Sequence, residues 1–532
     1  MEQTNKLFLR TGKFYLVLGI LALTLSASPA QTIIQNFSGL NSSDVAALGT
    51  GGTPPDTMGA AGTNQFVVFI NGGFAIYSKA GVRQSLVSDI AFWTNAGISG
   101  ATLSAGLTDP RIIYDVASGR WFATELTMNN TQNKVLVARS NSSDPAGGWK
   151  ALSFIGNSGG ADFDTLGVDS TGVYVGVNDF TSLGINGSFT GVSLFSIPKA
   201  DLLASTPTLA NMTKFENLSE TTYGFTLQGV CNPDAGPGHG VFIAVDDALK
   251  FIDRTTINGS GAAGATLSPR VRIATTYDAL PNPAQQPSSQ TVDAGDDRIS
   301  AAIRQVGGYI FMANNILQGS KDAVHWLVLN ETNNAVVGEG LISNASFDYF
   351  QPSITASHNG KILLAFNRCG TVAPAGDISI YAAVGTITNG TVSMGSPFLL
   401  KQGTVNNFSE GDPIPNGSHR WGDYCATMVD PTDEDLFWTI QEIPAGSTSW
   451  GTQITLISMV TNPPVLNLAR TGSTVELNWP LSTDPAYILQ TTTNLASAAV
   501  WNTLTNAPVV SINQNIVTLT QTNRLAFYRL KK

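Results

Sequence analysis

Short runs of alternating apolar and polar residues recur along most of the chain, and a turn and a second apolar run follow each of them. The stretch LGVDSTGVYVGVND, residues 166–179, has four valines separated by small or polar residues, with Asp169-Ser170-Thr171-Gly172 between the two runs. Alternation with a period of two indicates a strand, and a break rich in Asp, Ser and Gly indicates a tight turn. The pattern therefore predicts a β-hairpin.

The same pattern occurs seven times. The hairpins begin at Thr57, Arg111, Thr165, Thr226, Arg298, Pro352 and Tyr424. Further short strands follow most of them, such as KVLVARS from Lys134 and AVHWLVLN from Ala323. Repeated units of four strands are the signature of a β-propeller. We predict an all-β fold with a seven-bladed propeller, or a six-bladed one as the alternative. A string of β-sandwiches fits less well, because no Pro/Ser-rich linker separates the units before residue 460.

The two ends of the chain differ from this repeat. Lys6, Arg10 and Lys13 precede an apolar run, and Ser28-Pro29-Ala30 follows it, which predicts a signal peptide over 1–30. The last hairpin unit is one strand short, and the segment Thr32–Leu40 is expected to complete it, closing a propeller of residues 31–460. After Pro463-Pro464, residues 461–532 predict a small β-sandwich with Trp479 and Trp501 in its core.

Composition excludes some partners. The chain has 28 Lys and Arg against 38 Asp and Glu, and this acidic balance disfavours a nucleic-acid partner. No run after the first thirty residues is long and apolar enough to span a bilayer. The expected location is therefore secreted, extracellular or periplasmic.

The chain has three cysteines, so at most one disulfide is expected. Cys369 and Cys425 are the best candidates for a pair, but three free thiols are the expected result.

Several segments resemble known proteins. PPDTMGAAG from Pro54, DPRIIYDVASGRW from Asp109 and RWGDYCATMVDP from Arg420 resemble a group of secreted bacterial propellers related loosely to the sialidase-like propellers that contain Asp boxes. This resemblance implies the fold and little about chemistry. The turn from Ser142 to Trp149 resembles an Asp box whose glycine falls one place late, which implies a structural turn and not an active site. Residues 461–532 resemble fibronectin type III-like modules, which implies a spacing or attachment role.

Acidic residues precede most of the predicted first strands. They are Asp56, Asp109, Asp164, Asp297 and Asp423. Polar residues also end the second strands, for example Asn71, Glu125, Asn314, Asn367 and Glu442. Because the two strands are antiparallel, both sets are expected at one mouth of the channel. Oxygen-rich surfaces suit Ca²⁺ or sugar hydroxyls, whereas an Asp before a strand also commonly orders a turn. Asp56 and Asp164 have no arginine nearby in sequence, so they are the candidate Ca²⁺ ligands.

Three arginines, Arg111, Arg298 and Arg420, stand beside these acidic residues. Sialidases bind a carboxylate with three arginines, so these arginines are candidate ligand-binding residues together with Asp109, Asp297 and Asp423. The favoured interpretation is that each arginine neutralises its neighbouring acid. Catalytic signals are weak: Glu125 and Glu442 are candidates only because Glu is rare at these strand ends. We therefore expect a secreted binding protein for a glycan, peptide or cation, with a sialidase-like glycoside hydrolase or a structural surface component as the alternatives.

Overall fold

The computed structural model describes residues 31–459, except 185, 237, 247 and 412, and then residues 466–480, 487–495, 500–511, 514–520 and 525–531. The predicted signal peptide lies outside the described residues, as does the boundary segment at Thr461–Pro464. None of the described helices is long and apolar enough to cross a membrane.

Almost all regular structure between residues 32 and 458 is antiparallel sheet. In chain order the strands are β1 (Thr32–Asn41), β2 (Met58–Ala61), β3 (Gln65–Ile70), β4 (Gly73–Ser78), β5 (Arg83–Val87), β6 (Leu107–Asp115), β7 (Arg120–Thr127), β8 (Lys134–Ser140), β9 (Trp149–Ile155), β10 (Gly160–Val168), β11 (Gly172–Phe180), β12 (Phe189–Pro198), β13 (Thr213–Leu218), β14 (Phe225–Cys231), β15 (Gly240–Val245), β16 (Phe251–Asn258), β17 (Thr266–Leu267), β18 (Val271–Ala274), β19 (Ala284–Gln285), β20 (Thr291–Val292), β21 (Ile303–Val306), β22 (Tyr309–Gln318), β23 (Lys321–Asn330), β24 (Val336–Ile342), β25 (Phe347–Ala356), β26 (Lys361–Gly370), β27 (Ser379–Thr388), β28 (Thr391–Met394), β29 (Phe398–Lys401), β30 (Ala426–Asp430), β31 (Asp433–Gly446) and β32 (Ser449–Ser458).

These strands pair as successive four-stranded sets. The orders are β2-β3-β4-β5, β6-β7-β8-β9, β10-β11-β12-β13, β14-β15-β16-β17, β21-β22-β23-β24, β25-β26-β27-β28 and β30-β31-β32-β1. Each of the seven predicted hairpins is present as the antiparallel pair of the first two strands of a set. A parallel pairing of β14 with β21, at Val230–Ile303 and Cys231–Arg304, joins two neighbouring sets.

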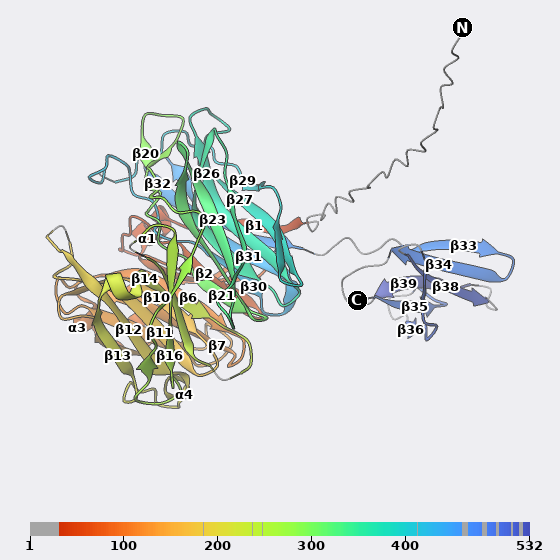
Figure 1. Cartoon of the computed structure of the whole chain (residues 1–532), viewed down its shortest axis with the longest axis horizontal. Coiled ribbons are helices and arrows are strands. Elements are labelled where there is room, and N and C mark those ends of the chain that lie inside the picture. The colour runs from red at the N-terminus through yellow and green to blue at the C-terminus, as the bar shows by residue number, and fades with distance from the viewer. Residues whose placement is uncertain are drawn as a thin grey trace, which may run out of the picture.

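The sets form a closed ring around a channel. The first strands β2, β6, β10, β14, β21, β25 and β30 contact one another in that order, and β30 contacts β2. Figure 1 shows β2, β6, β10 and β21 close together in the middle of this part of the molecule. The first strands come very close together: a Cβ built on Gly167 would lie 2.9 Å from the carbonyl carbon of Gly229 on the neighbouring strand. A ring of sheets with their first strands innermost is a β-propeller architecture.

The last sheet contains both ends of the ring. The amino-terminal strand β1 pairs with β32, from Thr32–Ser458 to Asn41–Gly451, as the sequence predicted. Across this closure the ring of Trp438 in β31 packs against Phe37 of β1 and Phe66 of β3, with centroids 6.5 and 5.3 Å apart. The outer edge of the last sheet is thereby paired, and burial of large aromatic side chains supports the closure.

Helices are few and short. They are α1 (Ser42–Ala47), α2 (Asp89–Asn95), α3 (Gly100–Leu103), α4 (Lys199–Leu203) and α5 (Glu220–Tyr223). The repeat pattern did not predict α2, whose amino end is capped by the Ser88 hydroxyl. Its Phe92 stacks on Phe74 of β4 and contacts Trp149 of β9, with centroids 4.4 and 5.1 Å apart. The helix thus fills the space between two adjacent sheets with aromatic side chains.

The carboxy-terminal strands form two further small sheets. Strands β33 (Asn467–Thr471), β34 (Thr474–Pro480), β38 (Gln514–Thr520) and β37 (Val509–Ser511) pair in that order, and β36 (Asn502–Thr503), β35 (Ile488–Thr492) and β39 (Phe527–Lys531) make the other. Both sheets contribute to one apolar cluster that contains Leu477, Trp479 and Leu489. Trp479 is in the core as expected. Trp501 is only partly buried, and the guanidinium of Arg529 lies over its ring.

Candidate functional site

A repeated backbone irregularity marks one mouth of the channel. Pairing of the first two strands shifts register at residues 109–110 in β6, 163–164 in β10, 226–227 in β14 and 351–352 in β25. In each case the first residue of the bulge has a positive φ: 61° at Asp109, 54° at Phe163, 55° at Thr226 and 49° at Gln351. Asp56, just before β2, has a φ of 46°. Strained backbone of this kind clusters at functional sites. Asp109 and Phe163 are therefore equivalent, and Asp164, which the sequence grouped with Asp109, lies one residue further along its strand.

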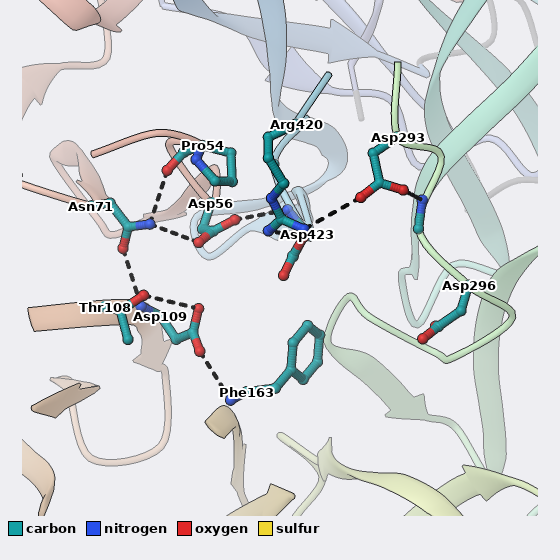
Figure 2. A network of polar contacts seen from close by, with 12 residues as sticks. Pro54, Asp56, Asn71, Thr108, Asp109, Phe163, Asp293, Asp296, Arg420 and Asp423 are labelled. Carbon is teal, nitrogen blue, oxygen red and sulfur yellow. Dashed lines mark hydrogen bonds and ion pairs between the residues drawn. The ribbon is translucent and has the colours of Figure 1, made fainter. Parts of the chain in front are cut away.

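Asp56 and Asp109 tie neighbouring sheets together at this mouth. Asn71 donates from Nδ2 to Asp56 Oδ2 at 2.7 Å, and its Oδ1 accepts from the backbone N–H of Asp109 at 3.1 Å (Figure 2). Asp109 Oδ2 accepts from the backbone N–H of Phe163 at 2.9 Å, and Asp56 Oδ1 accepts from that of Asp423 at 2.8 Å. These two carboxylates thus order loops of four sheets, as an Asp before a strand often does.

Burial keeps these acids away from their ordinary titration range. Burial, followed by the charge of Asp423, raises the pKa of Asp56 to about 7. Burial also raises the pKa of Asp164 to about 7, against the lowering effect of Arg111. The pKa of Asp109 is raised well above its usual value by burial and then by neighbouring acids, with Asp162 first. A fraction of these groups is therefore protonated near neutral pH.

Arg111 does not neutralise Asp109. It is buried, with Nε donating to the carbonyl of Asp164 at 2.8 Å and Nη1 donating to that of Ser300 at 2.9 Å. Its guanidinium lies 3.4 Å from the centre of the Tyr424 ring and 4.9 Å from that of Phe163. Arg111 is thus part of a cation–aromatic layer across the channel and is not available to an external carboxylate.

The other two arginines each hold carboxylates. Arg298 binds Asp296 and not Asp297, with Nε donating to Oδ1 at 2.7 Å and Nη2 donating to Oδ2 at 2.5 Å. Although burial raises it, the Arg298 charge and hydrogen bonds keep the pKa of Asp296 below its usual value. Arg420 binds Asp423 at 2.8 Å, as the sequence suggested, and also Asp293 at 3.3 Å (Figure 2).

Asp297 lies apart from this group. Its carbonyl accepts from Asn314 Nδ2 at 2.8 Å. Burial, followed by the charges of Asp278 and Asp296, raises the pKa of the Asp297 carboxyl to about 7. Asp297 was predicted as a site residue because it precedes a strand that the sequence placed from Arg298. In the structure β21 begins only at Ile303. The side chain next to Arg298 is therefore that of Asp296.

Several of these residues surround a cavity of about 240 Å³ at this mouth, which we call the acidic-mouth cavity. It is lined by Phe163, Asp293, Ala294, Gly295, Asp296, Arg298, Ser300, Asn315, Gln351, Arg420 and Asp423. Most of the charged residues come from two long connections, which are held together by the hydrogen bonds from Asp293 N to His419 O and from His419 N to Thr291 O. Sequence reasoning missed Asp293, Asp296, Phe163 and Gln351. The acidic run DAGDDR from Asp293 was the signal for two of them.

The polar ends of the second strands mostly hold the backbone. Asn314 bonds the carbonyl of Asp297, and Asn367 Nδ2 donates to that of Glu442 at 2.9 Å. The polar groups that were expected to form a second exposed ring are therefore largely buried and bonded to backbone carbonyls.

The candidate glutamates are buried as well. Glu125 accepts from Trp93 Nε1, and Glu442 accepts from the N–H of Gly422 at 2.7 Å. Neither lines the acidic-mouth cavity.

Other expectations concern the metal, the Asp-box turn and the thiols. Among the described residues, no group of three or more His, Cys, Asp and Glu side chains is placed to hold a metal ion, so Ca²⁺ at Asp56 and Asp164 stays a prediction.

In the turn between β8 and β9, Asp144 Oδ1 accepts from Ala146 N at 3.0 Å, and Trp149 contacts Phe74 of the preceding sheet, as expected. Cys231, Cys369 and Cys425 are all buried thiols, and the Cys369–Cys425 bridge is not formed.

Comparisons with known proteins give fold-level similarities of low score. No protein-family model matches the sequence, and no curated protein does so significantly. Among solved structures, a protein of unknown function from Dyadobacter fermentans aligns at 10% identity and a TM-score of 0.39, covering 66% of this chain and 94% of that one. A Trypanosoma rangeli sialidase aligns at 11% identity and 0.31, covering 80% and 83%, and a Bacillus subtilis arabinanase at 11% and 0.29, covering 64% and 96%. At such scores the similarities assign no activity, substrate or site residue to this chain.

Proposed function

We propose that this chain is a secreted binding protein whose acidic-mouth cavity holds one hydroxyl-rich unit of an extracellular glycan. The observation that carries the proposal is the alternation of charged donors and acceptors around one small cavity. Asp293, Asp296 and Asp423 supply carboxylate acceptors, and Arg298 and Arg420 supply guanidinium donors. Each sugar hydroxyl both donates and accepts, so a surface that offers both kinds of group suits it.

The charged groups are held in place before any ligand arrives. Arg298 is fixed by two hydrogen bonds to Asp296, and Arg420 lies between Asp423 and Asp293. Pre-ordered side chains reduce the entropy lost on binding. The cavity, at about 240 Å³, is smaller than the ~300–1,000 Å³ pockets that enclose drug-sized ligands, which favours a single terminal sugar.

A neutral sugar suits the cavity better than an acidic one. Three carboxylates and two guanidinium groups line it, and both guanidinium groups already bind carboxylates. The third arginine, Arg111, is enclosed between aromatic rings. A sialidase-like arrangement of three free arginines is therefore not supported, and neither candidate glutamate lines the cavity. A glycoside hydrolase would have to use Asp293, Asp296 or Asp423 instead.

Seven blades, a fibronectin type III-like tail and secretion complete the proposal. The seven four-stranded sets and the closed order of their first strands support the blade count. The common core of the two carboxy-terminal sheets supports a separate β-sandwich. The charged and apolar pattern of residues 1–30 supports export.

The test is a glycan array followed by calorimetric titration of the best binder. Neutral glycans should bind and sialylated ones should not. Asp296→Asn and Arg420→Gln should each weaken binding by at least about tenfold, the effect of a buried charged hydrogen bond. Asp144→Asn, in the turn between β8 and β9, is the matched control and should bind as the wild type does.

Other outcomes overturn the proposal. A preference for sialylated glycans would contradict the assignment of a neutral ligand. Release of reducing sugar that Asp423→Asn abolishes would establish the hydrolase. Absence of any glycan binding, with self-assembly in solution, would favour the structural component.

A further inference from the structure

A second cavity lies on the other side of the Arg111–Tyr424 layer. We call it the turn-end cavity, because it extends to the mouth at which the first strands run into their turns. Its volume is about 230 Å³, and Met58, Ile112, Ile303, Ile354 and Met428 are among its lining residues. Ile112 directly follows Arg111, which places the layer between this cavity and the acidic mouth. The two cavities are therefore separate sites.

The largely apolar lining of the turn-end cavity includes one arginine, Arg304 of β21. Its Nε is buried without any partner among the described residues. Burial lowers the pKa of the Arg304 guanidinium below its usual value, although nearby acids oppose the effect.

The nearest acids are bound elsewhere. Glu434, which also lines the cavity, accepts from His358 Nδ1 at 2.9 Å, and Asp234 Oδ1 lies 2.7 Å from His358 Nε2. His358 thus engages both carboxylates. Asp430, which also lines the cavity, is bound by Lys79 and by Trp438 Nε1, so each of these acids has a partner other than Arg304. Leaving a buried guanidinium nitrogen unpaired costs free energy, and an anion would recover it.

We propose that the turn-end cavity binds a small monocarboxylic acid with an apolar body, whose carboxylate pairs with Arg304. The planar fork of an arginine suits a carboxylate, and ligand sites typically combine an apolar lining with one or a few polar anchors. An apolar cavity of roughly 150 Å³ accommodates benzene, so about 230 Å³ accommodates an arylalkyl acid or a short fatty acid.

The test is calorimetric titration of the full chain with 3-phenylpropionate and with its uncharged amide. The acid should bind at least about tenfold more tightly than the amide to the wild type. Arg304→Gln should weaken acid binding at least tenfold and leave amide binding unchanged. Arg83→Gln, on the outer strand β5, is the matched control and should leave both affinities unchanged. Ala302→Leu, which places a larger side chain in the lining, should weaken both ligands.

A second measurement separates a binding role from a folding role. If Arg304 is retained for a ligand, Arg304→Met should melt at the same or a higher temperature than the wild type without ligand. Thermal stabilisation by octanoate should occur in the wild type and be lost in this variant. No binding of either acid at millimolar concentration, equal affinity for acid and amide, or an acid affinity that Arg304→Gln does not change would each overturn the proposal. Glycan binding at the acidic mouth is measured separately, so the two proposals fail independently.

Discussion

The guanidinium of Arg111 lies 3.4 Å from the centre of the Tyr424 ring, and these two residues come from β6 and from the loop before β30. The Tyr424 hydroxyl donates to the carbonyl of Pro110 at 3.0 Å. Both side chains are almost fully buried. The contact thus links two first strands across the channel and divides the channel into two cavities of opposite character.

Loss of this ring should destabilise the fold more than loss of its hydroxyl. Tyr424→Leu removes the cation–aromatic contact, which is worth about 2 kcal/mol when desolvated, and also leaves packing defects. Tyr424→Phe removes one hydrogen bond, worth about 1 kcal/mol. Urea unfolding should therefore rank wild type, Tyr424→Phe and Tyr424→Leu in decreasing free energy of unfolding. Equal losses for the two variants would show that the ring contact contributes nothing.

The buried acids predict a protein that is more stable in mild acid than at alkaline pH. Burial raises the pKa of Asp164 to about 7, so the folded state holds its proton where the unfolded state, with a pKa of about 3.9, has lost it. The stabilising contribution is complete below about pH 4 and is lost as the pH rises through 7. The free energy of unfolding should fall between pH 5 and pH 8.

Asp164→Asn provides the control for this pH dependence. Because Asn does not titrate, the fall between pH 5 and pH 8 should shrink by at most about 3 kcal/mol, since about two pH units separate pH 5 from the Asp164 pKa of about 7 and each is worth about 1.4 kcal/mol. Asp144→Asn should leave the profile unchanged. An unaltered slope in Asp164→Asn would mean that this carboxyl stays ionised in the fold.

Calcium is expected to raise the melting temperature. Asp164 Oδ1 is buried without a hydrogen-bond partner among the described residues, and Asp56 lies in the same acidic group. A cation that binds only the folded state stabilises it by mass action, and more so at pH 8 than at pH 5 because more carboxylates are ionised. Asp56→Asn and Asp164→Asn should reduce the shift, whereas Asp144→Asn should not. A melting temperature that responds neither to Ca²⁺ nor to chelator would refute the cation site.

Ring closure predicts an asymmetry between the two ends of the chain. Removal of residues 31–41 deletes β1 and exposes the edge of β32, so the melting temperature should fall by more than about 5 °C and aggregation should increase. A chain that ends at residue 459 keeps every strand of the ring and should melt within about 1 °C of the full chain. Limited proteolysis near Thr461–Pro464 should yield the same fragment. Unfolding of the shortened ring would show that residues 466–531 are integral to it.

The sequence by itself determined the hairpins and the closure of the ring. Alternation of apolar residues is imposed locally by the pleat of a strand, so Val173, Val175 and Val177 were sufficient to identify β11. The last hairpin unit was one strand short, which predicted that Thr32–Leu40 would pair there. Helix α2 was missed because it fills a gap between two sheets, which no local period reveals.

Only the tertiary structure decided which charged groups meet. A bulge at residues 163–164 shifts the register, so Phe163 and not Asp164 occupies the position of Asp109. Arg298 turns to Asp296, and Arg111 leaves Asp109 for the ring of Tyr424. Side chains that are adjacent in sequence point in directions set by backbone dihedrals and by the packing of distant strands. Proximity along the chain therefore predicted the Arg420–Asp423 pair but not the partners of Arg111 and Arg298.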